Sequence, residues 1–334
     1  MRHLTLIVAA LALTAAVSCE SSGNKYVEVS GFTQGVEFSV KFNTKALKIS
    51  PEQATHYIDS ILTVADSTLS GYNPGSMLSR YNRGEKVEPN WIMKDIFDRS
   101  KDAFEISDHT VDVTAAPLFD LWGFGFTGED DYVPSEEEIA ATMKISGMQN
   151  FSGDLSQAAP GQKLNFNAIG QGYTCDLIAE YLYSIGATDM LVSIGEIYLD
   201  GLNPAGKNWT VAIDSPIDGN NEPGEHVQGY WHSDGKAHGL VTSGNYRKFF
   251  VRDGQKYSHT IDPRTGRPVQ HNLLSATVLA DDSCTADAMS TACMVLGLEK
   301  AKEFLQEKGL EGFLVYDEAG ELHTWCTPGF NITY

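Results

Sequence analysis

The sequence predicts a single α+β domain with an antiparallel-rich sheet and flanking helices. Segments rich in β-forming residues come in pairs that short glycine-containing turns separate, which is the pattern of hairpins. Helical segments come in blocks and do not alternate one by one with strands, so a parallel sheet is not expected. A hydrophobic fraction of 42% across 334 residues is ample for a core, and no repeat or interdomain linker divides the chain.

The first part of the chain predicts one hairpin and two helices. Residues 26 to 42 alternate apolar and polar residues on both sides of Gly35, which predicts two paired strands. Ser50 and Pro51 suit the cap and the first turn of a helix that follows them. A second helix is expected at about residues 91 to 106.

Residues 123 to 128 match the G-x-G-x-x-G spacing of a dinucleotide-binding fingerprint, but their context excludes that interpretation. The fingerprint needs a strand before it and a helix that opens within it. Here three acidic residues follow, which would repel a pyrophosphate. The next helix begins only at Ser135, with Glu138 in capping-box spacing. We therefore expect an ordered loop packed on the core.

The middle of the chain predicts several strands, a helix and an insertion. Residues 163 to 187 indicate a strand, a glycine turn and a helix, and residues 189 to 201 indicate one further strand. Residues 209 to 214 are another strand. Residues 215 to 238 are polar and rich in glycine, proline and histidine, so we expect an exposed insertion there.

The last third of the chain returns to hairpins and helices. Residues 238 to 260 predict a strand, a turn and a hairpin that Asp253 and Gly254 close. Helices are expected around residues 285 to 308. Residues 312 to 326 predict a final hairpin.

Residues 259 to 291 combine a polar turn, an apolar strand and the start of a helix. The turn is DPRTG, in which proline and glycine favour a tight reversal. Residues 273 to 280 are apolar and rich in β-forming residues. Ser283 or Thr285 is expected to cap the helix that follows.

Two oxygen-bearing side chains stand near the start of this last helix. We expect Asp287 in its first turn and Thr291 in its second, so both leave the same face near the positive end of the helix. They supply hard oxygen donors but too few for a closed metal site, which suits Mg²⁺ when substrate phosphates complete its shell. The plainer interpretation is a capped helix with two solvent-facing residues.

The turn at residues 167 to 172 is a second candidate binding element. Gly170 and Gly172 leave backbone amides and carbonyls accessible to a ligand at a helix N-terminus. A plain connection from a strand to a helix explains the same residues equally well.

The formal net charge of −20 limits the possible partners. Nucleic-acid binding is excluded, because it needs a basic face. A substrate that carries phosphate would need a local cation. Beyond Cys19, four cysteines match no zinc spacing and allow two disulfides; Cys293, among apolar helical residues, is expected to be buried and unbridged.

Residues 1 to 18 have the pattern of a lipoprotein signal peptide. They combine an arginine, an apolar run and small residues before Cys19, and the run is too short for an ordinary spanning helix. Cys19 is then the lipidated first residue, and residues 19 to 25 form a tether. We therefore expect a domain anchored in the bacterial cell envelope, at the periplasmic face of the inner membrane.

Six sequence blocks stand in a specific order along the chain. They are LSGYNPGSMLSRYN, VDVTAAPLFDLWGFG, FNAIGQGYTCD, VTSGNYRKFF, YSHTIDPRTGRPV and ADAMSTACMVLG. Together they resemble the ApbE family of FAD:protein FMN transferases, and the resemblance spans residues 30 to 325. It implies one ApbE-like domain at residues 26 to 334.

The resemblance implies an activity and its participants. Such an enzyme transfers FMN from FAD, with Mg²⁺, to a Thr or Ser hydroxyl of an acceptor protein and releases AMP. FAD is the substrate and Mg²⁺ the cofactor. The implied acceptors are subunits of the sodium-translocating NADH:quinone reductase or of the Rnf complex, and Cys19 would carry the membrane anchor.

The resemblance also implies which residues form the site. His259 is the candidate base, although a lone histidine in a hairpin is more often structural. The implied metal ligands are the backbone carbonyl of Ala168 and the side chains of Asp287 and Thr291. The implied FAD contacts are Gln34, Tyr72, Val113, Thr114, Ala115, Gln171 and Ile261.

Other polar residues near these motifs have plainer roles. Asp112 and Asp262 are expected to accept hydrogen bonds from turn amides. Arg247, Arg264 and Arg267 are candidates to neutralise phosphate, although arginines near turns are usually just solvated.

Two departures from the family pattern and two alternative functions stay open. Gln171 replaces the usual Lys, and the usual paired glycines are reduced to one, Gly195, before Glu196. One alternative is a Mg²⁺-dependent FAD pyrophosphatase, in which water replaces the acceptor hydroxyl. The other is a non-catalytic flavin-binding lipoprotein, which would not need a base such as His259 beside a metal.

Overall fold

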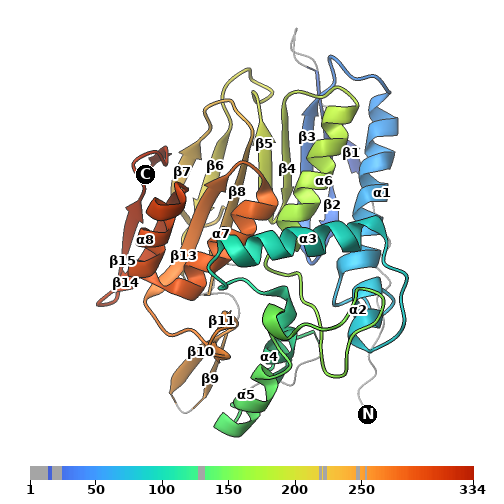
Figure 1. Cartoon of the computed structure of the whole chain (residues 1–334). Helices are drawn as coiled ribbons and strands as arrows, with labels where there is room; N and C mark the ends of the chain where they lie inside the picture. Colours follow the sequence, from blue (N-terminus) through green and yellow to red (C-terminus); the bar gives the residue numbers. More distant parts are fainter. Residues whose placement is uncertain are drawn as a thin grey trace, which may run out of the picture.

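The centre of the computed structural model is one nine-stranded sheet with strand order β1-β2-β3-β4-β5-β8-β13-β14-β15 (Figure 1). The structure describes residues 14–16, 25–126, 132–217, 220, 224–245, 249–252 and 254–334. Every neighbouring pair of strands in this sheet is antiparallel. The predicted α+β class with an antiparallel-rich sheet is therefore confirmed.

The central sheet brings both ends of the chain into one layer. Its strands are β1 (Thr14–Ala16), β2 (Tyr26–Thr33), β3 (Val36–Asn43), β4 (Met190–Ile194), β5 (Glu196–Asp200), β8 (His238–Gly244), β13 (Leu273–Ala280), β14 (Glu311–Glu318) and β15 (Glu321–Cys326). The predicted first and last hairpins are confirmed as β2–β3 and β14–β15.

Helices cover one face of the sheet, and a small sheet covers part of the other. The helices that contact the sheet are α1 (Pro51–Leu69), α6 (Gly170–Ser184), α7 (Ser283–Leu296) and α8 (Leu298–Lys308); α2 (Met77–Asn82) and α3 (Trp91–Ile106) pack on these helices (Figure 1). On β14, Leu314 packs under the helices, whereas Phe313 and Val315 join the cluster on the opposite face. This alternation is what a strand buried on both faces requires.

Local signals predicted the helix starts well. Ser50 caps α1 in a complete capping box, and α3 has the bounds expected from its pattern. Ser135 and Glu138 form the second capping box at the start of α5 (Glu136–Met143). Both boxes satisfy amides that a first helical turn leaves unpaired.

A smaller group of elements lies below the sheet in Figure 1. It contains α4 (Ala116–Leu121), α5, the hairpin of β9 (Phe249–Arg252) and β10 (Gln255–Ser258), and the pair β11 (Ile261–Asp262) and β12 (Arg267–Pro268). Trp122 and Phe124 are buried in its core, and the Trp122 indole donates to the Gly266 carbonyl at 2.8 Å. The expected ordered loop is confirmed up to residue 126; residues 127–131 lie outside the described residues.

Two strand predictions in the middle of the chain were wrong. Residues 163 to 166 form no strand, because the Asn82 side chain hydrogen-bonds both the amide and the carbonyl of Leu164. Residues 189 to 201 form two strands, β4 and β5, since Gly195 turns the chain at φ +77°. Glycine adopts this backbone conformation without the strain that a side chain adds.

The segment at residues 215 to 238 is not simply an exposed insertion. It contains β7 (Val227–His232), which pairs with β6 (Thr210–Asp214) and β16 (Ile332–Thr333) in the small sheet. Trp231 of β7 is only 2% exposed and belongs to the core on that face.

The cap of α7 also differs from the prediction. Asp282 is the N-cap and accepts from the Thr285 amide at 2.8 Å, whereas the Ser283 hydroxyl donates to the Ile197 carbonyl at 2.8 Å. Asp287 therefore lies in the second turn. The four cysteines beyond Cys19 are all free, and Cys293 is buried as expected.

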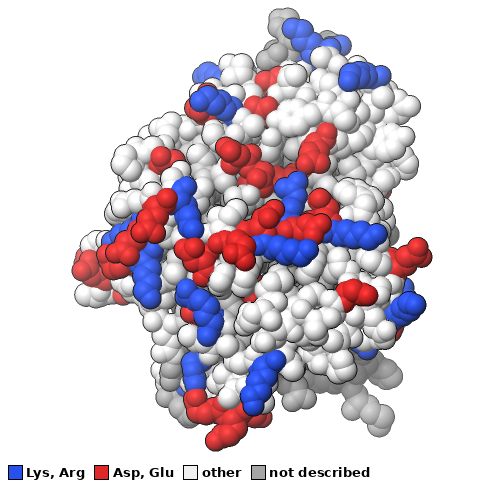
Figure 2. Space-filling view, in the orientation of Figure 1, with Lys and Arg blue, Asp and Glu red and all other residues white. Residues whose placement is uncertain are grey.

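Most of the predicted N-terminal signal and tether, with Cys19, lies outside the described residues. The exception is β1, which pairs with β2 at the edge of the sheet. Within the described ranges, no helix has the length and apolar character needed to cross a membrane. On the face in Figure 2, acidic and basic side chains are interspersed. Among the described residues, Arg99 and Asp95 form an ion pair at 3.4 Å.

Candidate active site

A cavity of about 1170 Å³ lies where the helices meet the smaller group of elements. Its wall combines the β2–β3 turn, the end of α1 and the loop after it, residues 110 to 115, the turn before α6, the end of β8, residues 259 to 263, and α7. All implied site residues except Thr114 line it. Segments from both halves of the sequence therefore form one site.

Asp287 forms the buried floor of this cavity. It is only 4% exposed, and its Oδ2 accepts a hydrogen bond from the Gly172 amide of α6 at 3.1 Å. Burial raises the pKa of Asp287 to about 7, and the Gly172 N–H opposes that rise. One amide hydrogen bond is little stabilisation for a buried negative charge. A bound cation would lower the pKa of Asp287 and favour its ionised form.

Gly172 lets α6 and α7 approach closely enough for this contact. A Cβ atom at Gly172 would lie 2.2 Å from the Ser283 carbonyl oxygen and 2.9 Å from the Asp287 Cβ. Such distances are far inside van der Waals contact, and the first partner is rigid backbone. Only glycine fits between the two helices at this point.

The other two implied metal ligands face the same cavity. The Thr291 hydroxyl is 3.3 Å from the Ser243 hydroxyl, which also lies 2.8 Å from that of Ser290. Ala168 lies in the turn where the Ile169 amide bonds the Phe166 carbonyl at 3.0 Å. A carboxylate, a hydroxyl and a carbonyl are hard oxygen donors, so this set fits Mg²⁺.

This donor set includes only one carboxylate. In the described part of the chain, no group of three or more His, Cys, Asp or Glu side chains could hold a metal ion. A Mg²⁺ ion here would complete its shell with water and substrate oxygens, as Mg²⁺ sites commonly do.

The start of α6 is tied to the β2–β3 turn. Gln34 has a left-handed backbone with φ +48°, and its side-chain amide donates to the Thr174 hydroxyl at 2.9 Å. Gln171 reaches the Gln34 carbonyl at 3.5 Å. α6 has no side-chain cap, and Gly170 and Gln171 line the cavity, so its positive end faces the ligand space.

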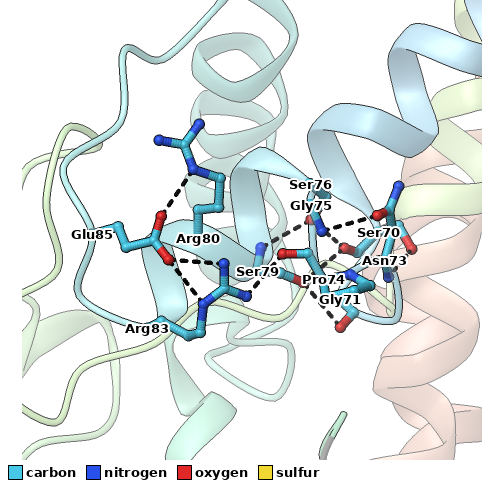
Figure 3. Close-up of polar contacts among 10 residues, drawn as sticks. All are labelled: Ser70, Gly71, Asn73, Pro74, Gly75, Ser76, Ser79, Arg80, Arg83 and Glu85. Atoms are coloured by element: carbon cyan, nitrogen blue, oxygen red, sulfur yellow. Dashed lines mark hydrogen bonds and ion pairs between the residues drawn. The ribbon is translucent and has the colours of Figure 1, made fainter.

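Tyr72 stands at the open edge of the cavity on a well-ordered loop. Its side chain is 62% exposed and meets Phe126 edge-on at 5.1 Å between ring centroids. Figure 3 shows how polar contacts hold the loop: the Ser79 hydroxyl contacts the carbonyls of Ser70 and Gly71 at 3.2 and 3.1 Å. The loop thus presents an exposed aromatic ring from a fixed backbone.

A second layer of contacts holds the same loop from α2. The Arg83 guanidinium donates to the Pro74 carbonyl at 2.9 Å and pairs with Glu85, which also binds Arg80 (Figure 3). The Ser76 hydroxyl donates to the Ser70 carbonyl at 2.5 Å. None of these residues was among the predicted site residues; Ser76 and Arg80 belong to the block LSGYNPGSMLSRYN, whereas Arg83 and Glu85 lie just beyond its end.

Residues 112 to 115 form a short helical turn against the cavity. Val113 and Ala115 line it, whereas the Thr114 hydroxyl turns back to Asp112. Asp112 accepts from the amides of Thr114 at 2.9 Å and Met148 at 2.8 Å, which confirms its expected structural role.

His259 and Ile261 enter the cavity from the opposite side, after β10. Both line it, and Ile261 is 2% exposed. The turn that follows is fixed by Asp262, which accepts from the Arg264 amide at 2.9 Å, and by Gly266 at φ +71°. The predicted tight turn is confirmed.

The charges around the cavity are acidic. Arg264 pairs with Asp262 and Arg267 with Glu136, and neither lines the cavity; Arg247 lies outside the described residues. No Lys or Arg occurs among the described lining residues. The lining carboxylates are Asp59, Asp66, Asp112, Glu196 and Asp287. Sequence reasoning missed Asp59 and Asp66, which no short motif marks. It also gave no role to Ser243 and Glu196, although Ser243 stands in the block VTSGNYRKFF and Glu196 follows Gly195.

The chain was compared with known protein families. The model of the ApbE family matches residues 34–314. The chain belongs to the ApbE family. The match runs from Gln34 in the β2–β3 turn to Leu314 in β14 and includes every residue of the implied site.

Relatives with assigned activities agree with the ApbE match. The FAD:protein FMN transferase of Escherichia coli K12 is 36% identical over 285 residues, which cover 82% of this chain and 79% of that protein. The FAD:protein FMN transferase of Vibrio cholerae serotype O1 is 34% identical over 90% of this chain and 89% of its own.

Solved ApbE structures share the fold. The apo form of Pseudomonas stutzeri flavinyl transferase ApbE has a TM-score of 0.79 and 33% identity, over 91% of this chain and 95% of its own. The Vibrio cholerae flavin transferase ApbE has a TM-score of 0.77 and 29% identity, over 92% and 99%.

Proposed function

We propose that this chain is a Mg²⁺-dependent enzyme that transfers FMN from FAD to a Thr or Ser hydroxyl of an acceptor protein and releases AMP. Its ApbE membership and its FAD:protein FMN transferase relatives support flavin transfer. The Mg²⁺ requirement, the hydroxyl acceptor and the residue roles are proposals that rest on the site.

The observation that carries the Mg²⁺ requirement is the charge of the cavity. Its floor is the buried carboxylate of Asp287, and no Lys or Arg is found among its described lining residues. FAD brings a pyrophosphate, which such a wall repels. A divalent cation held by Asp287, Thr291 and the Ala168 carbonyl removes that conflict, because it attracts both partners.

The size of the cavity supports a large substrate. Its volume of about 1170 Å³ exceeds the range of about 300–1,000 Å³ that is common for small-molecule sites. Gln34 and Gln171 offer amide groups, and Tyr72 an aromatic face, to the flavin or the adenine. We assign FAD binding to these residues together with residues 113 to 115 and Ile261.

His259 is the proposed base. Its neutral imidazole accepts the proton of the acceptor hydroxyl while the acceptor oxygen forms a bond to the FMN-side phosphorus. The bond from that phosphorus to the bridging oxygen breaks, and AMP leaves with its electron pair. When bound, Mg²⁺ neutralises charge on the pyrophosphate, as in other phosphoryl transfers.

The location and the partners follow as further proposals. We propose that Cys19 is lipidated after removal of residues 1 to 18, so that the enzyme faces acceptors at the periplasmic side of the inner membrane. Subunits of the sodium-translocating NADH:quinone reductase or of the Rnf complex are the candidate acceptors.

A direct assay tests the proposed reaction. The domain without its lipid anchor is incubated with FAD, Mg²⁺ and an acceptor domain; AMP is followed by chromatography and protein-bound flavin by fluorescence in a denaturing gel. AMP together with a labelled acceptor is the expected result. AMP and free FMN without label would indicate a pyrophosphatase, and bound FAD without either product a flavin-binding lipoprotein.

His259→Ala separates an enzyme from a binder. We expect turnover to fall by roughly 10²–10⁴-fold, the usual contribution of a general base, while FAD still binds. His238→Ala is the control, since its ring bonds Asp234 at 2.8 Å and does not line the cavity. Unchanged turnover in His259→Ala would remove this residue from the mechanism.

A further inference from the structure

We propose that Asp176 is a positioning residue that holds α6 and α7 in the register needed to bring the two halves of the metal site together. The inference rests on the proposed function, because it concerns the same Mg²⁺ site. Asp176 does not line the cavity and belongs to none of the roles described so far.

Asp176 ties α6 directly to the first turn of α7. Its side chain is only 4% exposed. Oδ1 accepts from the Ser283 amide at 2.8 Å, and Oδ2 from the Cys284 amide at 2.9 Å. These two amides lack partners within the helix, so a carboxylate placed on them is bound by two hydrogen bonds and by the positive end of the helix.

The contact forms one half of a reciprocal pair. One turn before Asp176 on α6, the Gly172 amide donates to Asp287, which lies one turn after Ser283 on α7. Each helix thus donates to the other from its backbone and accepts with a carboxylate. A slide of either helix by one residue would break both contacts.

Close packing removes the remaining freedom at the start of α7. A Cβ at Gly239 of β8 would lie 2.4 Å from the Asp282 carbonyl carbon. The Ser283 hydroxyl is bonded to the Ile197 carbonyl of β5. The first turn of α7 therefore fits tightly among α6, β5 and β8, and Asp176 supplies the side-chain contact that joins it to α6.

This arrangement matters because the proposed ligands come from both helices. Ala168 precedes α6, whereas Asp287 and Thr291 stand on α7. The distance between the two ligand groups is set by how the helices dock. Mg²⁺ demands near-ideal octahedral geometry, so small displacements of its ligands weaken binding.

Asp282 provides a matched control within the same helix. It caps α7 through the Thr285 amide at 2.8 Å and the Thr285 hydroxyl at 2.8 Å, and its Oδ1 lies 3.9 Å from the Arg99 guanidinium of α3; none of these contacts involves α6. Removal of this cap costs about 0.5–2 kcal/mol of stability. Asp282→Ala thus weakens the helix start without cutting the link to α6.

The test measures metal-dependent binding and not turnover. FAD binding is followed by flavin fluorescence during Mg²⁺ titration, for the wild type, Asp176→Ala, Asp176→Asn and Asp282→Ala. We expect Asp176→Ala to raise the half-saturating Mg²⁺ concentration about tenfold, as for residues that orient metal ligands. Asp176→Asn keeps one hydrogen-bond acceptor, so its half-saturating Mg²⁺ concentration should lie between those of the wild type and Asp176→Ala. For Asp282→Ala this concentration should stay within about twofold of the wild-type value.

Each outcome decides a distinct question. If Asp176→Asn and Asp176→Ala match Asp282→Ala in this concentration, Asp176 only stabilises the fold and the inference is overturned. If Asp176→Ala does not fold, the test rests on Asp176→Asn. A half-saturating Mg²⁺ concentration of Asp176→Asn equal to that of the wild type would then overturn the inference. A wild type that binds FAD without any Mg²⁺ dependence would instead overturn the proposed metal site.

Discussion

The floor and the open edge of the cavity are built in opposite ways. At the floor, α6 and α7 meet through Gly172 with no room for a methyl group, and Asp287 is 4% exposed. At the edge, Tyr72 is 62% and Phe32 59% exposed. The carboxylate proposed to hold a metal is thus placed by close packing, whereas the aromatic side chains at the edge are open to solvent. Changes at the floor should therefore be costly and changes near the edge mild.

The largest effect is expected from Asp287→Ala. It removes the only carboxylate of the proposed metal site, so Mg²⁺-dependent flavin transfer should fall by about a thousandfold or more, as when a main electrostatic stabiliser is lost. AMP release at saturating FAD is the measurement. Asp281→Ala, at a nearby exposed position, serves as control. Full activity of Asp287→Ala would refute the metal site.

Gly172→Ala tests the tight packing of the floor. The added methyl group would meet the rigid Ser283 carbonyl at 2.2 Å, so we expect a loss of about 3 kcal/mol in the free energy of unfolding. Urea denaturation measures it. Gly170→Ala is the matched control on the same helix, because the nearest atom to its new Cβ is 3.9 Å away. Equal stability of both variants would show that the helices can separate without cost.

The third prediction concerns how stability near the floor depends on pH. Burial and the nearby Asp282 raise the pKa of Asp176 to about 7, against the two α7 amides and Arg99. The folded state therefore binds more protons than the unfolded state between roughly pH 4 and 7, and stability falls as pH rises through this window.

Asp176→Asn isolates this contribution. Between pH 5 and pH 7, the wild type should lose about 2 kcal/mol of unfolding free energy relative to Asp176→Asn, which has no such titration. Urea denaturation of both proteins at the two pH values gives the difference. A difference that does not change with pH would mean that Asp176 stays ionised throughout.

The smallest effect is expected from Gln171→Lys, in the first turn of α6 where that helix lines the cavity. Gln171 makes only a long contact of 3.5 Å with the Gln34 carbonyl, and a lysine would add positive charge to an acidic cavity. FAD should bind no more weakly than to the wild type, as measured by flavin fluorescence. A large loss of FAD affinity would show that Gln171 tolerates substitution as poorly as the floor residues do, and would contradict the proposed difference between the floor and the edge.

Predictions from the sequence succeeded where short-range chemistry decides the structure. The capping boxes at Ser50 and Ser135 and the turn at Gly35 depend on neighbours a few residues away. The four-residue spacing of Asp287 and Thr291 likewise placed both on one helix face that meets the cavity.

The failures came from partners that are distant in sequence. Leu164 is held by the side chain of Asn82, and Trp231 is buried because β7 finds partners that include β16. Ser283 does not cap α7, since its hydroxyl bonds the Ile197 carbonyl of β5. The contact between Gly172 and Asp287 was hidden for the same reason. No local pattern indicates such pairings.

The position of β3 in the sheet has a consequence for biosynthesis. Phe38 of β3 pairs with Ile194 of β4, so the ribosome must make about 150 more residues before this edge is covered. At the usual ~5–20 residues per second this takes roughly 10–30 s, during which Val40 and Phe42 can pack only against β2 and α1 and lack the α6 and β4 part of their cluster. Unpaired apolar edges of this kind aggregate readily. The nascent chain is therefore exposed to aggregation at this edge for a longer time than a chain in which both partners of a strand are its sequence neighbours.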